Sequence, residues 1–354
     1  MFGNNLKTAR NRAGLSLRGL EEKIGRLVSA QSIGKYERGD MLPSTQVVDA
    51  LAAALKVEKE FLLTEHSIEL GTIEFRENSA RHKIDEKAVS ATIREHLMRY
   101  LEVEQLLGDV SSNWDKPRQF PYPIRTLEEA ERAAHRLRDD WQLGSDPIPN
   151  LSEFLEERGF KIILADLSTL VAGVTCFVQT GKGQKIPVIV TCSSITGERQ
   201  RFTIVHELGH LLLEKVSSEL NIEKICNKFA GAFLMPERFL WDALGRSRSN
   251  ISIGELVSLK KFLGVSVQAI VYRCKDLGII NEYSYRALYK EFSNRGWLKP
   301  PYDEPNAIDI EEPQRFKRLC LRSLAEGLIN ESKAAELLVM PESQLHNEFN
   351  SLAY

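Results

Sequence analysis

The sequence predicts an α+β protein that is mostly helical, and three observations support this fold class. Apolar residues recur at helical spacing, behind capping residues, through most of the 354 positions. Three β-type runs lie close together between residues 160 and 194, which predicts one small sheet. A proline-rich stretch at 115–124 and an acidic stretch at 303–312 separate the helical regions. We therefore expect an all-α N-terminal domain, a central domain with a small sheet, and a C-terminal helical region.

These signals divide the chain into five segments. In order, we expect a helical domain, a helical linker, the central domain, a helical extension and a C-terminal helical unit, at residues 1–66, 67–125, 126–245, 246–300 and 301–354. The last unit is open to two interpretations. Its second half faintly resembles a second helix-turn-helix, and a dimerisation or regulatory module is an equal alternative.

The net charge, the cysteines and the hydropathy pattern favour a protein that has reduced thiols and does not span a membrane. The formal net charge is −2, so any basic surface for nucleic acid must be local. The five cysteines are scattered and form no CxxC pair, which favours reduced thiols. The N-terminus lacks the apolar run of a signal peptide, and no stretch approaches 18 apolar residues. We expect a soluble cytoplasmic protein with no membrane partner.

Residues 15–40 have the pattern of a supporting helix, a turn and a second helix that can enter the major groove of DNA. The spacing turns Ile33 and Tyr36 toward the core. The polar residues that it turns outward are Gln31, Ser32, Lys35 and Arg38. Residues 1–40 carry eight Lys or Arg against four Asp or Glu, the local positive charge that phosphate contacts need. We expect binding to a double-stranded operator; a small helical dimerisation domain is the alternative.

The stretches "SAQSIGKYERGD" and "PSTQVVDALAAAL" resemble the λ-repressor-like, or XRE-type, helix-turn-helix family. The resemblance implies that Ser29, Gln31, Ser32 and Lys35 face DNA. One departure is the turn "GRLVS", which is longer than the usual turn by about two residues and alters the docking angle. Symmetric half-sites lead us to expect a homodimer.

The segment "RFTIVHELGH" at 201–210 carries the pattern H-E-x-x-H. On a helix, His206 and His210 project from one face, so both imidazoles can bind one ion. Glu207 is rotated from His206 by roughly 100 degrees, which places its carboxylate over the open coordination position as a general base. The alternative is a helix with two incidental histidines. The strongly apolar surroundings argue against it, because burying unliganded histidines is costly.

A catalytic zinc usually takes a third protein ligand. The downstream residues that could supply it are Glu214, Glu219, Glu223 and Cys226. We favour Glu223 because it opens a helix that can fold back antiparallel, with Asn227 one turn later as a hydrogen-bond partner for a ligand. Cys226 remains the main competitor. We also expect the run at 186–192 to be the edge strand along which a substrate lies extended.

"RFTIVHELGHLLLE" followed by "EKICNKFAGAFLMP" resembles the ImmA/IrrE family of zinc-dependent metallopeptidases. The resemblance implies a zincin-like domain with His206, His210 and Glu223 as metal ligands and Glu207 as general base. Zinc is the expected ion, and manganese is the alternative for a His2Glu site.

This resemblance also implies the substrate class. The substrates are DNA-binding repressor proteins, which are cleaved to switch genes on, for example in stress or mobile-element control. We therefore expect a DNA-binding transcriptional regulator with metalloendopeptidase activity, acting on a repressor or on a second copy of itself, with single-stranded DNA as a candidate activator. The alternatives are a transcription factor whose peptidase fold is a non-catalytic sensor or structural module, and an antitoxin-like regulator.

Overall fold

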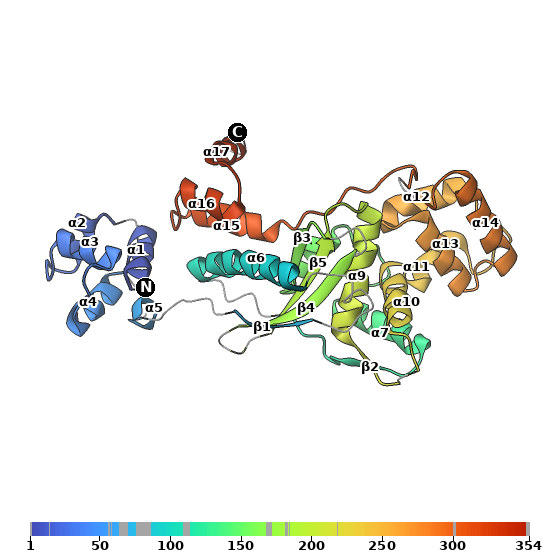
Figure 1. The fold of residues 1–354 in the computed structure, drawn as a ribbon, viewed down its shortest axis with the longest axis horizontal. Helices are drawn as coiled ribbons and strands as arrows, with labels where there is room; N and C mark the ends of the chain where they lie inside the picture. The colour runs from blue at the N-terminus through green and yellow to red at the C-terminus, as the bar shows by residue number, and fades with distance from the viewer. Residues whose placement is uncertain are drawn as a thin grey trace. The chain divides into compact units, whose positions relative to one another are not determined.

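The structure is a computed structural model, and it describes residues 2–13, 15–55, 57, 59–63, 70–75, 86–108, 114–167, 172–180, 183, 185–217, 219–299 and 302–351. The chain forms two compact units, each built from separate stretches of sequence. One unit contains residues 1–69, 95–112 and 314–354, and the other contains 70–94 and 113–313. Helices predominate and the sheets are small, which confirms the expected fold class (Figure 1).

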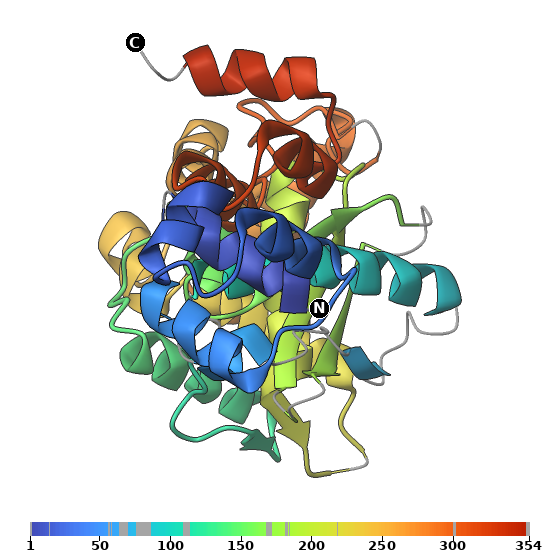
Figure 2. The same ribbon diagram turned by 90° about the vertical axis from the view of Figure 1, so that its left-hand side faces the viewer.

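The N-terminal helices form a bundle of their own (Figure 2). They are α1 (Phe2–Arg12), α2 (Leu17–Lys23), α3 (Ala30–Arg38), α4 (Thr45–Leu55) and α5 (Lys59–Leu63). Leu6, Leu20 and Ile33 lie in its core, as the helical spacing predicts. The Arg10 guanidinium donates to both carboxylate oxygens of Glu37, at 2.6 and 3.0 Å, and so ties α1 to α3.

A second helical cluster joins the long helix α6 (Glu86–Leu107) to the end of the chain. Its other members are α15 (Arg315–Ala325), α16 (Glu331–Leu338) and α17 (Glu342–Ser351). Tyr100 of α6 stacks on Phe316 with ring centroids 5.2 Å apart, and Arg315 forms an ion pair with the buried Glu104. The second half of α6 therefore packs with the C-terminal helices.

The main sheet has the order β1-β4-β5-β3. Its strands are β1 (Leu70–Phe75), β4 (Gly173–Thr180), β5 (Lys185–Cys192) and β3 (Lys161–Ala165). β5 pairs antiparallel with β4 and parallel with β3, so it is an interior strand. Our expectation that residues 186–192 form the substrate-binding edge is therefore wrong. The apolar run reflects a strand whose side chains are buried on both faces of the sheet, since every residue from Ile186 to Cys192 is buried.

The segment 67–125 differs from the helical linker that we expected. It contains α6, but it also contributes β1 to the main sheet and β2 (Tyr122–Ile124) to a second, two-stranded sheet. β2 pairs in parallel with β6 (Leu213–Lys215). Pairing with distant strands decides the structure here, because short runs of this kind have weak local preferences.

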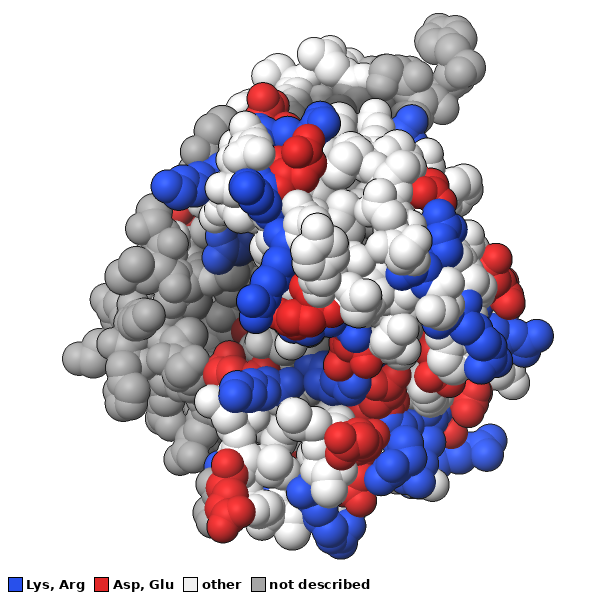
Figure 3. Space-filling model, turned by 90° about the vertical axis from the view of Figure 1, so that its right-hand side faces the viewer, with Lys and Arg blue, Asp and Glu red and all other residues white. Residues whose placement is uncertain are grey.

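The helical extension at 246–300 comprises α12 (Ile253–Leu263), α13 (Val267–Asp276) and α14 (Glu282–Asn294), and α11 (Glu237–Leu244) precedes it. On the side of the molecule where these helices lie, basic and acidic side chains are intermixed (Figure 3). Exposed ion pairs such as Lys275–Glu282 and Arg295–Glu291 account for part of this mixing. Among the described residues, no helix is both long and apolar enough to cross a membrane.

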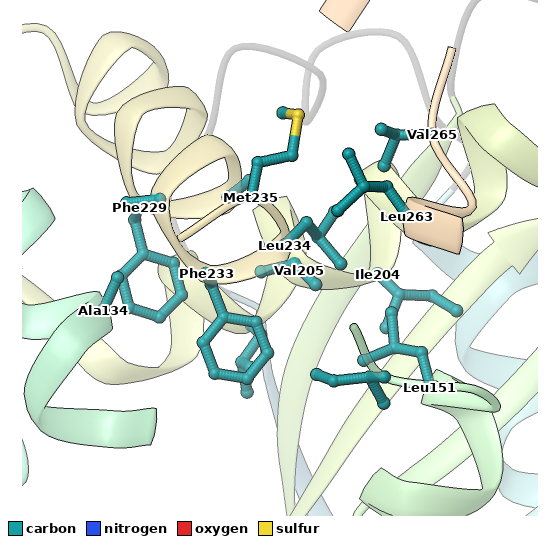
Figure 4. Packing of buried hydrophobic residues seen from close by; sticks show 14 of the residues in the cluster. Ala134, Leu151, Ile204, Val205, Phe229, Phe233, Leu234, Met235, Leu263 and Val265 are labelled. Carbon is teal, nitrogen blue, oxygen red and sulfur yellow. The ribbon is translucent and has the colours of Figure 1, made fainter. Parts of the chain in front are cut away.

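The core of the larger unit is formed where several helices meet the sheet. α9 (Gly197–Leu212) lies against β4 and β5, and it also contacts α8 (Leu151–Glu156) and α10 (Ile222–Leu234). α10 in turn packs on α7 (Leu127–Asp140). Figure 4 shows Ile204 and Val205 of α9 near Phe233 and Leu234 of α10 in this core. The two helices that carry the metal-site motif are thus fixed by apolar packing.

Candidate metal centre

Helix α9 presents His206 and His210, and its first turn is anchored by the acidic stretch that we expected to be a linker. Gly197 at the start of α9 has so little space that a Cβ there would lie 2.3 Å from the carbonyl oxygen of Ile308. Glu311 accepts from the backbone N–H of Ser152 at 2.8 Å and pairs with the buried Arg201 of α9. The stretch 303–312 is therefore packed structure that holds the helix with the H-E-x-x-H motif in position.

Helix α10 supplies Glu223 in its first turn. Asn221 caps this helix, and its side-chain oxygen accepts from the N–H of Glu223 at 2.9 Å. Gly209 of α9 allows α10 to come close, because a Cβ there would lie 3.2 Å from the Cys226 sulfur and 3.3 Å from the Phe229 ring. This close crossing brings the carboxylate of Glu223 to the histidines.

The three predicted ligand side chains converge. The Nε2 atoms of His206 and His210 are 3.2 Å apart. Glu223 places one carboxylate oxygen 3.2 Å from His206 Nε2 and the other 3.4 Å from His210 Nε2. One ligand atom from each residue lies within 4.8 Å of the others. Two imidazole nitrogens and a carboxylate oxygen are a donor set that suits zinc.

Asn227 orients the first histidine. Its Oδ1 lies 2.9 Å from Nδ1 of His206. An amide oxygen only accepts, so Nδ1 of His206 carries the proton and donates. In the neutral imidazole the lone pair is then on Nε2, which faces His210 and Glu223, and a protonated Nε2 can donate to Glu223. Hydrogen bonds of this type fix the tautomer of a metal-ligating histidine.

The local electrostatics show carboxylate and imidazoles stabilising each other's charge. Hydrogen bonds from His206 and His210 hold the pKa of Glu223 well below its usual range. Burial on its own would lower the pKa of His206, but the bond to Glu223 and the nearby carboxylates outweigh burial and raise it. The three groups therefore favour positive charge between them, as a cation-binding site requires.

Glu207 lies beside the ligands without joining them. It is 4% exposed, and its Oε2 is buried with no hydrogen-bond partner among the described residues. Burial raises the pKa of Glu207, against the opposing effect of the two imidazoles. A buried, unpartnered carboxylate is costly and is typical of a functional site rather than of a structural one.

The other three candidate ligands lie elsewhere. α9 ends at Leu212, so Glu214 is an exposed residue of β6 and does not continue the row of histidines. Glu219 is exposed, and it is not among the residues whose ligand atoms converge. The Cys226 thiol is buried against Gly209, and burial raises its pKa well above the usual range. Cys226 therefore packs as a small apolar residue.

Gly173, at the start of β4, is a site residue that the sequence analysis missed. A Cβ at this position would lie 2.5 Å from Thr203 and 3.1 Å from Cγ of Glu207. Only glycine lets β4 pass this close to the general-base candidate. A glycine inside a β-type run is the signal that could have located it.

Of the predicted DNA-facing residues, Ser29 caps α3 and the others lie on this helix. Gln31, Lys35 and Arg38 are exposed, whereas Ile33 and Tyr36 are buried. Ser29 caps α3 by accepting from the N–H of Ser32 at 3.2 Å. These two residues therefore set the start of the helix, and their hydroxyls also lie 3.0 Å apart.

The long turn before α3 is held by a side chain of α2. α2 ends at Lys23 and α3 begins at Ala30. Glu21 accepts from the N–H of Ala30 at 3.1 Å, which provides a second cap for α3. Gly25 and Arg26 have positive φ angles of 68° and 58°, as a chain reversal requires.

Comparison with known families agrees with this architecture. Residues 156–275 match the Peptidase M78 model, described as the IrrE N-terminal-like domain. Residues 6–62 match a helix-turn-helix model. The expected fusion of an XRE-type helix-turn-helix to a peptidase domain of the ImmA/IrrE kind is thereby confirmed. A search of curated proteins found no match to the chain.

Proposed function

Because the chain joins a helix-turn-helix domain to a metallopeptidase-like domain, we propose that it is a DNA-binding regulator that cleaves a repressor-type transcription factor. The observation that carries the proposal is the convergence of His206, His210 and Glu223 beside the buried carboxylate of Glu207. A purely structural metal site has no need of such a carboxylate.

We propose that His206, His210 and Glu223 hold zinc, with manganese as the alternative ion. A bound zinc ion supplies a Lewis acid that polarises a peptide carbonyl and lowers the pKa of water. By accepting from Nδ1 of His206, Asn227 would leave the Nε2 lone pair of this ring free to bind the ion.

Glu207 is proposed to act as the general base. Its free Oε2 can accept a proton from the attacking water, and it can then deliver this proton to the leaving amine. The apolar packing around α9 excludes bulk water, which strengthens each electrostatic interaction at the site. The neighbouring strand β4 offers backbone groups that can align an extended substrate.

A repressor is the proposed substrate because of the fusion. A helix-turn-helix bound at an operator would hold the peptidase where other DNA-binding proteins sit, and tethering raises the local concentration of enzyme and substrate to the millimolar range or so. A second copy of this chain is a substrate candidate by the same argument.

The test is incubation of the full chain, loaded with zinc or manganese, with candidate repressors and with itself, in the presence and absence of single-stranded DNA. We expect a discrete cleavage product from the unmodified chain. Glu207→Gln should bind metal normally and lose at least 100-fold in rate, because only proton transfer is removed. Equal products from both chains would rule out the proposed mechanism. Metal binding and operator binding without any cleavage would favour a non-catalytic sensor.

A further inference from the structure

One edge of strand β4 lies beside the candidate active site. Its first three residues, Gly173 to Thr175, pair with β5 on the inner side. On the outer side, β1 pairs with β4 only from Cys176 to Thr180. No strand in the described part of the chain pairs with the outer side of Gly173–Thr175. Among the described residues, the outer edge of β4 is thus covered by β1 from Cys176 to Thr180 and by no strand at Gly173–Thr175.

This outer edge is the one next to the general-base candidate. Gly173 approaches Glu207 so closely that a Cβ would lie 3.1 Å from its Cγ. A substrate must bring a peptide carbonyl to the cation beside Glu207. The nearest backbone ladder that can hold it extended is the outer edge of β4, because the inner edge is taken by β5.

β1 already lies on that edge in the manner of an extended substrate. It runs antiparallel to β4, from Leu70 opposite Thr180 to Phe75 opposite Cys176. Its carboxyl-terminal end is therefore the end nearer to Gly173 and Glu207. A substrate strand that paired with the whole outer edge would run in the same direction over the same backbone groups.

The β1–β4 ladder is also the weaker of the two ladders that β4 makes. Its register shifts between Leu70 and Ile73, where β1 has one residue more than β4 between paired positions. The β4–β5 ladder is regular from Gly173 to Gln179. A short, irregular edge strand can leave its sheet at a lower cost than an interior one.

We propose that β1 is a cis-bound occupant of the substrate edge, and that an extended segment of the protein substrate must displace it to pair along all of β4. This inference rests on the proposed peptidase function. The occupant's sequence, Leu-Gly-Thr-Ile-Glu-Phe, indicates the kind of segment that competes with it: extended, with apolar residues and no proline. β1 follows the helix-turn-helix domain in the chain, so the occupant is part of the connection between the two functions.

The test is binding rather than turnover, so it does not depend on catalysis. The full-length chain carrying Glu207→Gln is titrated with a fluorescent peptide that copies residues 70–75, with zinc present, and anisotropy is measured. The same titration is made with Ile73→Pro added, which removes a backbone donor and disfavours the strand. Ile73→Val is the matched control, since valine keeps the strand preference.

We expect Ile73→Pro to bind the peptide at least tenfold more tightly, and Ile73→Val to bind it as the parent does. A second variant, with residues 70–75 replaced by a Gly-Ser repeat, should behave like Ile73→Pro. Faster hydrogen exchange at the amides of Cys176–Thr180 in both variants would show that β1 has left β4. Unchanged peptide affinity in the Gly-Ser variant would overturn the inference.

Measuring the rate of peptide cleavage distinguishes a failure of this inference from a failure of the proposed peptidase function. In the chain with Glu207 intact, release of β1 should speed cleavage of an added extended peptide by a similar factor. If the variants bind the peptide more tightly but nothing is cut, the displacement of β1 by an extended segment stands as a binding event and the peptidase proposal fails. If peptide is cut at the same rate with and without β1, the peptidase proposal stands and the inference fails.

Discussion

The amide of Asn227 acts on the candidate metal site without touching the metal position. It accepts from Nδ1 of His206 and so decides which nitrogen of that ring is available. The sequence suggested this partnership from the spacing of Glu223 and Asn227 on one helix, but it did not indicate which histidine the amide would meet. That choice depends on how α10 crosses α9 at Gly209.

Asn227→Ala should weaken zinc binding about 10-fold to 100-fold, because His206 loses the acceptor that fixes its tautomer. Asn227→Asp should largely keep the affinity, since a carboxylate oxygen accepts the same hydrogen bond. Competition with a zinc chelator measures both. Asn294→Ala, at an exposed position on α14, is the control and should not change the affinity. Full zinc affinity in Asn227→Ala would contradict the orienting role.

At the scale of elements, the position of α10 depends on a cluster of charges that joins α7, α10 and α13. Glu131 pairs with Arg273 at 2.5 Å and with Lys228 at 2.6 Å. Asp276 also accepts from both cations, at 2.9 and 2.7 Å. Arg273 is buried, so its charge must be neutralised for the three helices to pack. The sequence did not predict this cluster, because its members are far apart along the chain.

Glu131→Gln should lower the free energy of unfolding at pH 7 by about 2 kcal/mol, since it leaves buried charge underpaired. Burial raises the pKa of Glu131, but the bonds to Arg273 and Lys228 outweigh it and lower the pKa to about 2. A depressed pKa stabilises the fold above the ordinary value of 4.5, and this contribution is lost as the pH falls toward 2.

The difference between the variant and the parent chain should therefore shrink as the pH drops from 5 toward 2 or so. Urea denaturation across this range measures it. Glu157→Gln, at an exposed position, should cost little at any pH. A constant difference at all pH values would show that Glu131 stabilises the fold by packing rather than by charge.

Strands β5 and β1 show what the local sequence pattern cannot predict, which is the pairing of strands in the sheet. The run at 186–192 was correctly predicted as a strand, but its interior position follows from pairing with β3 and β4. β1 was not predicted at all, because six residues without strict alternation carry a weak signal until a partner strand is present. The sheet order rules out β5 as an edge strand, and the proposed substrate edge is therefore on β4.

At the scale of the whole molecule, a chain with a net charge of −2 carries a helix-turn-helix domain with local positive charge. Exposed Lys35 lies on α3, on the side opposite the buried Ile33 and Tyr36. If α3 enters the major groove, this lysine is placed to contact phosphate.

Lys35→Gln should weaken binding to duplex DNA of any sequence, and it should reduce the slope of log affinity against log salt by about 1. Anisotropy titrations over a range of salt concentrations give the slope. Lys290→Gln, at an exposed position on α14, removes the same charge elsewhere and should leave the slope unchanged. Equal slopes for the Lys35 variant and the parent would mean that this lysine makes no phosphate contact.

The sequence by itself determined which side chains can do chemistry, since helical spacing puts His206 and His210 on one face and hides Ile33 and Tyr36 in a bundle. These features depend on the geometry of a single helix, which a few consecutive residues encode. Only the tertiary structure decided which carboxylate joins the histidines, which strand faces Glu207 and what covers that strand. Those relations join residues that are distant in the chain, and close packing of helices and strands, rather than local preference, brings them together.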